Sequence, residues 1–168
     1  MSTSFETWSR MPTPAPLRTP GIFLGFGFGG LVDGIVLHQI LQWHHMLSST
    51  EGYSKNTLRG LEVNTFADGL FHALTVGFLV VGSAVLWGVV RDHGVGRGRW
   101  LLGWVLAGWG IFNLTEGTIN HHILQLHHVR PGPNGALFDV AFLALGAVLL
   151  ICGLMLCRGY GRTRGRLG

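Results

Sequence analysis

Two stretches of this chain repeat one another, and they decide how the rest of it is interpreted. The first is DGIVLHQILQWHH at residues 33–45, and the second is EGTINHHILQLHH at residues 116–128. They align without gaps: acid matches acid, and glycine, histidine, isoleucine, leucine, glutamine and a closing histidine pair recur in order. Each stretch continues an apolar segment of roughly the length that crosses a bilayer. The repeat therefore predicts two similar halves that run in the same direction, related by an axis along the membrane normal.

The chain has four apolar segments of this kind. They lie at residues 21–43, 70–90, 100–119 and 137–157. A helix needs ~20 residues to cross the hydrocarbon core, and an open strand would leave backbone groups unpaired there. The second segment can begin near Val63, and the third can continue in register to His128. We therefore predict an all-α membrane protein, a bundle of four transmembrane helices built from two parallel two-helix repeats.

The repeats divide the chain into three parts. Repeat one takes residues 21–90 and repeat two takes residues 100–157, which together form one transmembrane domain. Residues 1–20 are expected to form a flexible tail, and residues 158–168 a basic tail. Arginine is concentrated in these tails and between the repeats, so the positive-inside rule puts both termini in the cytoplasm.

Composition agrees with a membrane location. Hydrophobic residues make up 48% of the chain and charged residues 12%, about half the ~25% that is usual for soluble domains. The basic residues lie mostly between and after the apolar segments, which argues against a nucleic-acid partner and for the lipid bilayer. Cys152 and Cys157 share the last segment without a CxxC motif, so they indicate neither a disulfide framework nor a thiolate zinc site.

Polar residues gather on one face of the apolar segments. Because a helix turns about 100° per residue, each repeated string presents its acid and three histidines to one side. No Lys or Arg lies inside an apolar segment, so buried acids there need protons, imidazolium ions or a metal ion as counter-charge. We predict a metal site of copper, zinc or iron. The candidate ligands are Asp33, His38, His44, His45, Asp68, His72, Glu116, His121, His127 and His128.

The predicted ligands fall into two layers if the helices stay straight. The inner layer would hold His38, His72 and His121 with Asp33, Asp68 and Glu116, and the outer layer would hold His44, His45, His127 and His128. The rise of about 1.5 Å per residue places His44 about 9 Å above His38, too far for both to bind one ion. Asn113, Asn120 and Gln42 are candidates for orienting the inner histidines. Binding should weaken at acidic pH, because the ligands must be deprotonated.

Two other uses of the polar cluster remain open. His38 and His121 are equivalent in the repeat and could be the axial ligands of a b-type haem. The histidine layers could instead form an ion or proton pathway, for which a homodimer is expected because four helices are few for alternating access. If the protein is an enzyme, a metal-dependent membrane oxidoreductase is the expected class. His122 points away from the other histidines and is expected to make a structural contact.

The strings GFGFGGLVDGIVLHQILQWHHM and NLTEGTINHHILQLHHVRPG resemble those of a bacterial family of membrane proteins, domain of unknown function 2243. The resemblance covers about residues 20–157 and implies a four-helix protein of the inner membrane, without a settled activity. These proteins also resemble neighbours of cytochrome-oxidase assembly factors. That likeness implies copper or haem, and a respiratory-chain or metal-delivery partner.

Overall fold

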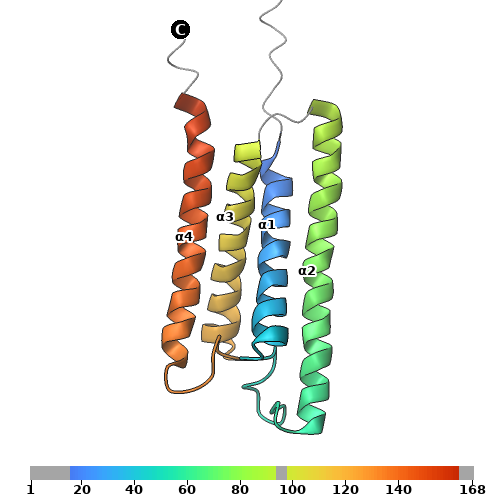
Figure 1. The fold of residues 1–168 in the computed structure, drawn as a ribbon, viewed down its shortest axis with the longest axis vertical. Helices are drawn as coiled ribbons and strands as arrows, with labels where there is room; N and C mark the ends of the chain where they lie inside the picture. Colours follow the sequence, from blue (N-terminus) through green and yellow to red (C-terminus); the bar gives the residue numbers. More distant parts are fainter. Residues whose placement is uncertain (1–15, 94–97, 163–168) are drawn as a thin grey trace, which may run out of the picture.

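Four long helices stand side by side in the computed structural model, which describes residues 16–93 and 98–162 (Figure 1). They are α1 (Arg18–Asp33), α2 (Leu58–His93), α3 (Gly98–Glu116) and α4 (Gly135–Arg162). A seven-residue π-helical segment follows each central helix: η2 (Gly34–Ile40) extends α1, and η3 (Gly117–Ile123) extends α3. The described residues contain no strand. The all-helical class predicted from the sequence is therefore confirmed.

The two central helices, α1 and α3, run in the same direction and pack directly against each other (Figure 1). The outer helix α2 packs on α1, and α4 packs on α3. Glycine permits the close central contact, since a Cβ at Gly25 would collide with the Val105 carbonyl oxygen. A Cβ at Gly108 would collide with the backbone of Ile22 in the same way. Such small residues are typical of helix pairs that approach closely in membranes.

The bundle has an apolar exterior and a polar interior. Large apolar side chains such as Leu74 and Trp87 on α2, and Ile151 and Met155 on α4, are more than half exposed. The largest fully buried side chains, in contrast, are mainly histidine, asparagine and aspartate. Within the described residues, three helical stretches are long and apolar enough to cross a membrane: Arg18–Ile40, Leu58–Asp92 and Gly135–Arg158. This distribution is that of a protein whose outer surface faces lipid.

The helices end at different residues from those predicted. The first ends at Ile40 rather than at residue 43, and the third ends at Ile123 instead of continuing to His128. The cause is a backbone reversal, because Gln42 and Gln125 adopt left-handed φ values of 50° and 51°. The outer helices are longer than predicted, since α2 begins at residue 58 and α4 extends over residues 135–162.

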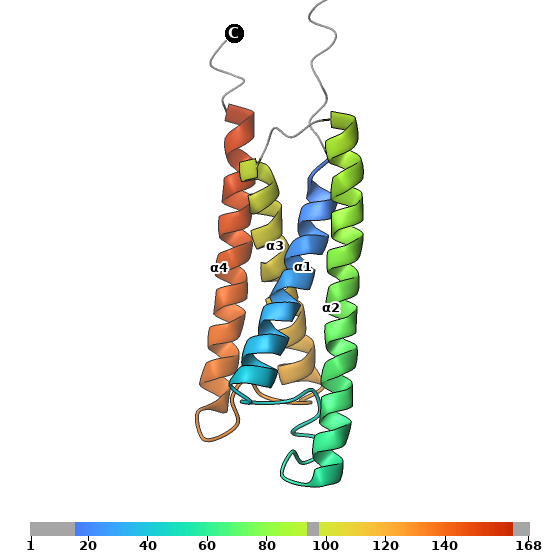
Figure 2. The same cartoon turned by 45° about the vertical axis from the view of Figure 1, so that its right-hand side comes forward.

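The two connections that follow η2 and η3 lie at the same end of the bundle, opposite to the C-terminal end of α4 (Figure 2). They fold back under the central helices, and Ser49 N–H in one donates to the Leu126 carbonyl in the other. The histidines that close each repeated string are in these connections. Of the predicted tails at residues 1–20 and 158–168, residues 1–15 and 163–168 lie outside the described residues, whereas residues 18–20 belong to α1 and residues 158–162 belong to α4.

Candidate metal centre

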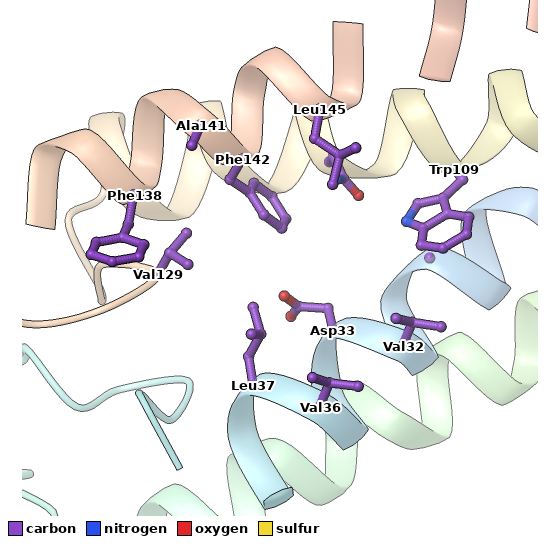
Figure 3. Close-up of a pocket in the computed structure, with 12 residues that line it drawn as sticks. Val32, Asp33, Val36, Leu37, Trp109, Val129, Phe138, Ala141, Phe142 and Leu145 are labelled. Carbon is purple, nitrogen blue, oxygen red and sulfur yellow. The ribbon is translucent and has the colours of Figure 1, made fainter. Parts of the chain in front are cut away.

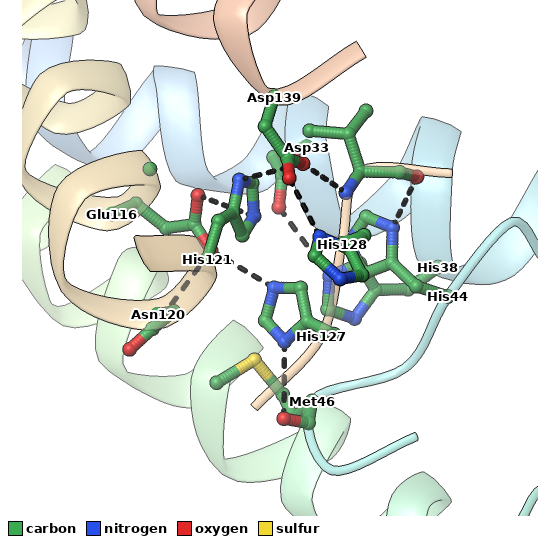
Figure 4. A network of polar contacts seen from close by, with 12 residues as sticks. Asp33, His38, His44, Met46, Glu116, Asn120, His121, His127, His128 and Asp139 are labelled. Carbon is green, nitrogen blue, oxygen red and sulfur yellow. Dashed lines mark hydrogen bonds and ion pairs between the residues drawn. The ribbon is translucent and has the colours of Figure 1, made fainter. Parts of the chain in front are cut away.

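Four histidines come together where the central helices end (Figure 4). The backbone reversal returns His44 to His38, so that their ring centroids are 4.4 Å apart, and it returns His127 to His121 at 4.9 Å. The rings of His44 and His127 stack in parallel at 4.5 Å. The expected separation into two layers, with His44 about 9 Å from His38, is therefore wrong, because the helix does not continue straight to His44.

Backbone carbonyls fix two of these rings. His44 Nδ1 donates to the Val129 carbonyl oxygen at 2.7 Å, and His127 Nδ1 donates to the Met46 carbonyl oxygen at 3.1 Å. A carbonyl can only accept, so both rings carry their proton on Nδ1 when neutral, which leaves a lone pair on Nε2. Burial lowers the pKa of His44 to about 2, which keeps its ring neutral.

Carboxylates fix the other two rings. His38 Nδ1 donates to Asp68 Oδ1 at 2.9 Å, and His121 Nδ1 lies 3.5 Å from Asp139 Oδ1. The carboxylate again favours the Nδ1–H form and aims Nε2 at the opposite side of the ring. Metal-bound histidines commonly have such a partner, because it fixes the tautomer and makes the ligand nitrogen more basic.

The free nitrogens face two buried acids. Asp33 Oδ2 lies 3.4 Å from His38 Nε2, while Glu116 Oε2 lies 3.2 Å from His121 Nε2 and its Oε1 lies 3.0 Å from His127 Nε2. A lone pair on Nε2 cannot bond an ionised carboxylate oxygen, so each of these contacts needs a proton or a metal ion between the two atoms. Two ligands on one tetrahedral ion with bonds of about 2.1 Å are about 3.4 Å apart, close to these separations.

The centre contains buried polar atoms without a hydrogen-bond partner among the described residues. Asp33 Oδ2, His38 Nε2, His44 Nε2, Glu116 Oε2 and both ring nitrogens of His121 are buried without a hydrogen bond. The contacts of His38 with Asp33 and of His121 with Glu116 are short but do not meet hydrogen-bond geometry, whereas His127 Nε2 and Glu116 Oε1 do. Polar atoms are rarely left unpaired in a protein interior, so their convergence on one point marks a place for a bound group.

Two sets of ligand atoms are compact enough to hold an ion. One set comprises His38, His44 and His127, and the other comprises Glu116, His121 and His127, each with all ligand atoms within 4.8 Å of one another. His127 belongs to both sets. Because its Nδ1 is already used by a carbonyl, only one nitrogen of His127 can bind metal.

The contacts recur between the halves with a constant offset of 83 residues. His44 bonds the carbonyl of Val129, and His127 bonds that of Met46, which is 83 positions before Val129. The chain reversals obey the same offset, since Leu41 N–H donates to Val36 and Leu124 N–H donates to Ile119.

Several predicted ligands have other partners. His45 Nδ1 donates to Asp68 Oδ2, and His128 Nδ1 donates to Asp139 Oδ2, both at 2.6 Å, so these outer histidines bind the orienting carboxylates. His72 Nδ1 donates to the Asp68 carbonyl of its own helix, and neither compact set includes it. Asp68 itself supports the ring of His38 from the side away from Asp33.

Asp139 was not among the predicted site residues, although it occupies the place that Asp68 has in the other half. The signal was present in the sequence, because Leu137-Phe138-Asp139 resembles Phe66-Ala67-Asp68.

The predicted orienting residues behave differently from one another. Asn120 donates to Glu116 Oε1 at 3.4 Å and not to one of the inner histidines, and Gln42 is exposed at the chain reversal. The amide oxygen of Asn113 is buried without a partner. His122 donates to the Gly117 carbonyl of its own segment, which is the structural contact expected for it.

Fold and surface together define an all-helical membrane protein with a buried histidine and carboxylate cluster near one end. The chain belongs to the family described as "Predicted membrane protein (DUF2243)", whose model matches residues 20–160. No curated protein and no solved structure matches the chain.

Proposed function

We propose that this protein binds at least one transition-metal ion inside the membrane. The ligands are His38, His44, His121 and His127, with the carboxylates of Asp33 and Glu116. The observation that carries the proposal is the orientation of the rings. His38, His44 and His127 donate Nδ1–H to an oxygen, His121 Nδ1 lies 3.5 Å from Asp139 Oδ1, and all four rings turn Nε2 to the shared interior. A cluster held together only by hydrogen bonds would not leave several of these Nε2 and carboxylate atoms unpartnered.

The donor set limits the metal. Imidazole nitrogens with carboxylate oxygens suit zinc, iron and Cu(II), and the compact sets contain no thiolate. A haem held by His38 and His121 is less compatible with this arrangement. The ring of His44 lies 4.4 Å from that of His38, and the ring of His127 lies 4.9 Å from that of His121. A porphyrin would need the space beside both ligands.

A metal in this position would supply Lewis-acid or redox chemistry. The protein residues would bind and orient it and exclude water, while His45 and His128 donate to the carboxylates of Asp68 and Asp139. Two uses fit a centre near the bundle end: transfer of the metal to a respiratory-chain partner, and a metal-dependent oxidoreductase reaction. Both depend on the same bound ion, so metal content is tested first.

Detergent-purified protein is expected to contain at least one copper, zinc or iron ion per chain, measured by mass spectrometry. The double variant His38→Ala with His121→Ala is expected to lose that metal, because each compact set then lacks a ligand. His122→Ala is the matched control, since this ring bonds only its own helical segment. Unchanged metal content in a folded double variant would refute the proposal and favour a proton relay.

We also propose that α3 is a fourth transmembrane helix and that the halves form a parallel repeat around a pseudo-twofold axis. The helix α3 lies between α1 and α4, so its polar residues need not face lipid. Recurrence of contacts at the 83-residue offset supports the axis.

The arginine distribution supports an orientation in the inner membrane with both termini cytoplasmic. Single cysteines at Tyr53 and Asn134, in a background without Cys152 and Cys157, are expected to react with an impermeant thiol reagent from the periplasmic side. A cysteine at Arg91 is expected to be protected until the membrane is opened. The reverse pattern would contradict the orientation and would move the metal centre to the cytoplasmic side.

A further inference from the structure

A pocket of about 290 Å³ lies between α1 and α4, beside the metal centre. Its walls are almost entirely apolar, and Val36, Phe138, Phe142, Leu145 and Trp109 supply most of them (Figure 3). An engineered protein cavity of about 150 Å³ accepts benzene, so this pocket has room for a substituted aromatic ring. The helices α1 and α4 do not pack on each other, and Val36 and Leu145 are exposed. The pocket therefore opens towards the apolar exterior of the bundle.

Two polar groups interrupt this apolar lining, and both are acceptors without a hydrogen bond. The Asn113 amide oxygen is buried and unpartnered, and the residue is only 2% exposed. The Asp33 carboxylate projects from α1 into the space that Phe142 and Leu145 border from α4 (Figure 3). A carboxylate and an amide among the lining residues of an apolar pocket favour a ligand with an O–H or N–H donor.

The pocket lies on the α4 side of the bundle and not on the α2 side. One reason is that the two halves differ at two positions. With the 83-residue offset, Gly29 corresponds to Phe112, and Asn113 corresponds to Gly30. On the α2 side, the ring of Phe112 packs edge-on against Phe26 at 5.3 Å and lies 6.2 Å from Phe71. Aromatic rings thus occupy the α2 side at the level where the α4 side has a glycine and an unpartnered amide.

We infer that the pocket binds a membrane-dissolved aromatic alcohol, a molecule of the phenol or quinol class, whose single O–H lies between the Asn113 amide and the Asp33 carboxylate and donates to one of them. The ring would pack among Trp109, Phe138 and Phe142, and it would enter laterally from the lipid. Asp33 also contacts His38, so the bound hydroxyl would lie next to the proposed metal centre. The inference does not rest on the metal, because the pocket and its two acceptors are formed by side chains alone.

The test measures quenching of Trp109 fluorescence by 4-bromophenol in lipid nanodiscs, with chelator-treated protein and with Trp109→Phe for background subtraction. The donor-free analogue 4-bromoanisole is the matched probe. We expect saturable quenching by the phenol, with affinity at least about tenfold above that of the ether, consistent with a hydrogen bond to a charged acceptor. Asn113→Leu should reduce this preference. Ala141→Phe, which fills the pocket, should abolish saturation, whereas Ala144→Phe, on α4 but outside the lining, should not.

Two results would overturn the inference. Equal, non-saturable quenching by both probes in wild type and Ala141→Phe would mean that the probes only partition into lipid. Saturable binding of both probes with equal affinity, lost in Ala141→Phe, would mean an apolar site without recognition of a donor. Neither result depends on metal content, so failure here is separate from failure of the proposed metal site.

Discussion

Replacement of His127 by alanine is expected to reduce the transition metal bound to purified protein by at least about tenfold. His127 is the one residue common to both compact ligand sets. Its Nε2 lies 3.0 Å from Glu116 Oε1, and its ring stacks on that of His44. Loss of this ring would therefore leave each set with two ligands and open the centre to water.

His44→Ala is expected to have a smaller effect, because it leaves Glu116, His121 and His127 in place. Mass spectrometry is expected to find the most bound metal per chain in wild type, less in His44→Ala, and least in His127→Ala. Circular dichroism in detergent would check that each variant is still helical, and His122→Ala is again the matched control. A folded His127→Ala protein with its full complement of metal would contradict the shared-ligand geometry.

The residue identities at the centre could be predicted from the sequence because the repeat makes them visible. Asp33 and Glu116 occupy matched positions, and so do His38 and His121. Charge balance then restricts what can neutralise the acids inside a bilayer. The repeat and the charge balance depend only on residue types and their spacing. Neither argument needs to know where the backbone goes after the helix ends.

The three-dimensional arrangement could not be predicted, because it depends on a change of helix type. In an α-helix, residues five apart differ by about 140° around the axis, so His38 would not lie over Asp33. A π-helix closes its hydrogen bonds from i to i+5, which brings His38 over Asp33 and His121 over Glu116. Such segments are rare and often occur at functional sites. The left-handed φ of a glutamine is equally hard to foresee, since glycine and asparagine are the usual residues there.

The change of chain direction also explains why His44 and His127 do not form the outer layer that the sequence predicts. Sequence distance along a straight helix separates His44 from His38 by about 9 Å, whereas the folded chain places their rings 4.4 Å apart. His45 and His128, one residue later, face Asp68 and Asp139 instead. The two histidines that end each repeated string therefore have different roles. The first ring faces the centre, and the second donates to the carboxylate that lies beside the earlier histidine of the same string, which is Asp68 for His38 and Asp139 for His121.

The Asp68 carboxylate is expected to control metal affinity without binding metal. Its Oδ1 accepts from His38 Nδ1 at 2.9 Å and from the backbone N–H of Met46 at 3.0 Å, while its Oδ2 accepts from His45 Nδ1 at 2.6 Å. In Asp68→Asn one of these oxygens becomes an NH₂ group, which cannot accept from an N–H. One histidine must then move its proton to Nε2, and if that ring is His38, its ligand atom is lost.

The expected result is a loss of metal affinity of about 10–100-fold in Asp68→Asn, with most of the helical structure retained. Titration of chelator-treated protein with Zn²⁺ in competition with a fluorescent chelator measures it. Asp92→Asn is the matched control, because this carboxylate lies on the same helix but pairs with the exposed Arg91. The loss should be no larger at pH 6 than at pH 8, since a carboxylate partner strengthens the binding of a proton by an imidazole as well as the binding of a metal ion. Equal Zn²⁺ affinity in Asp68→Asn and wild type at both pH values would show that the ring of His38 needs no carboxylate to bind metal, and would remove Asp68 from the centre.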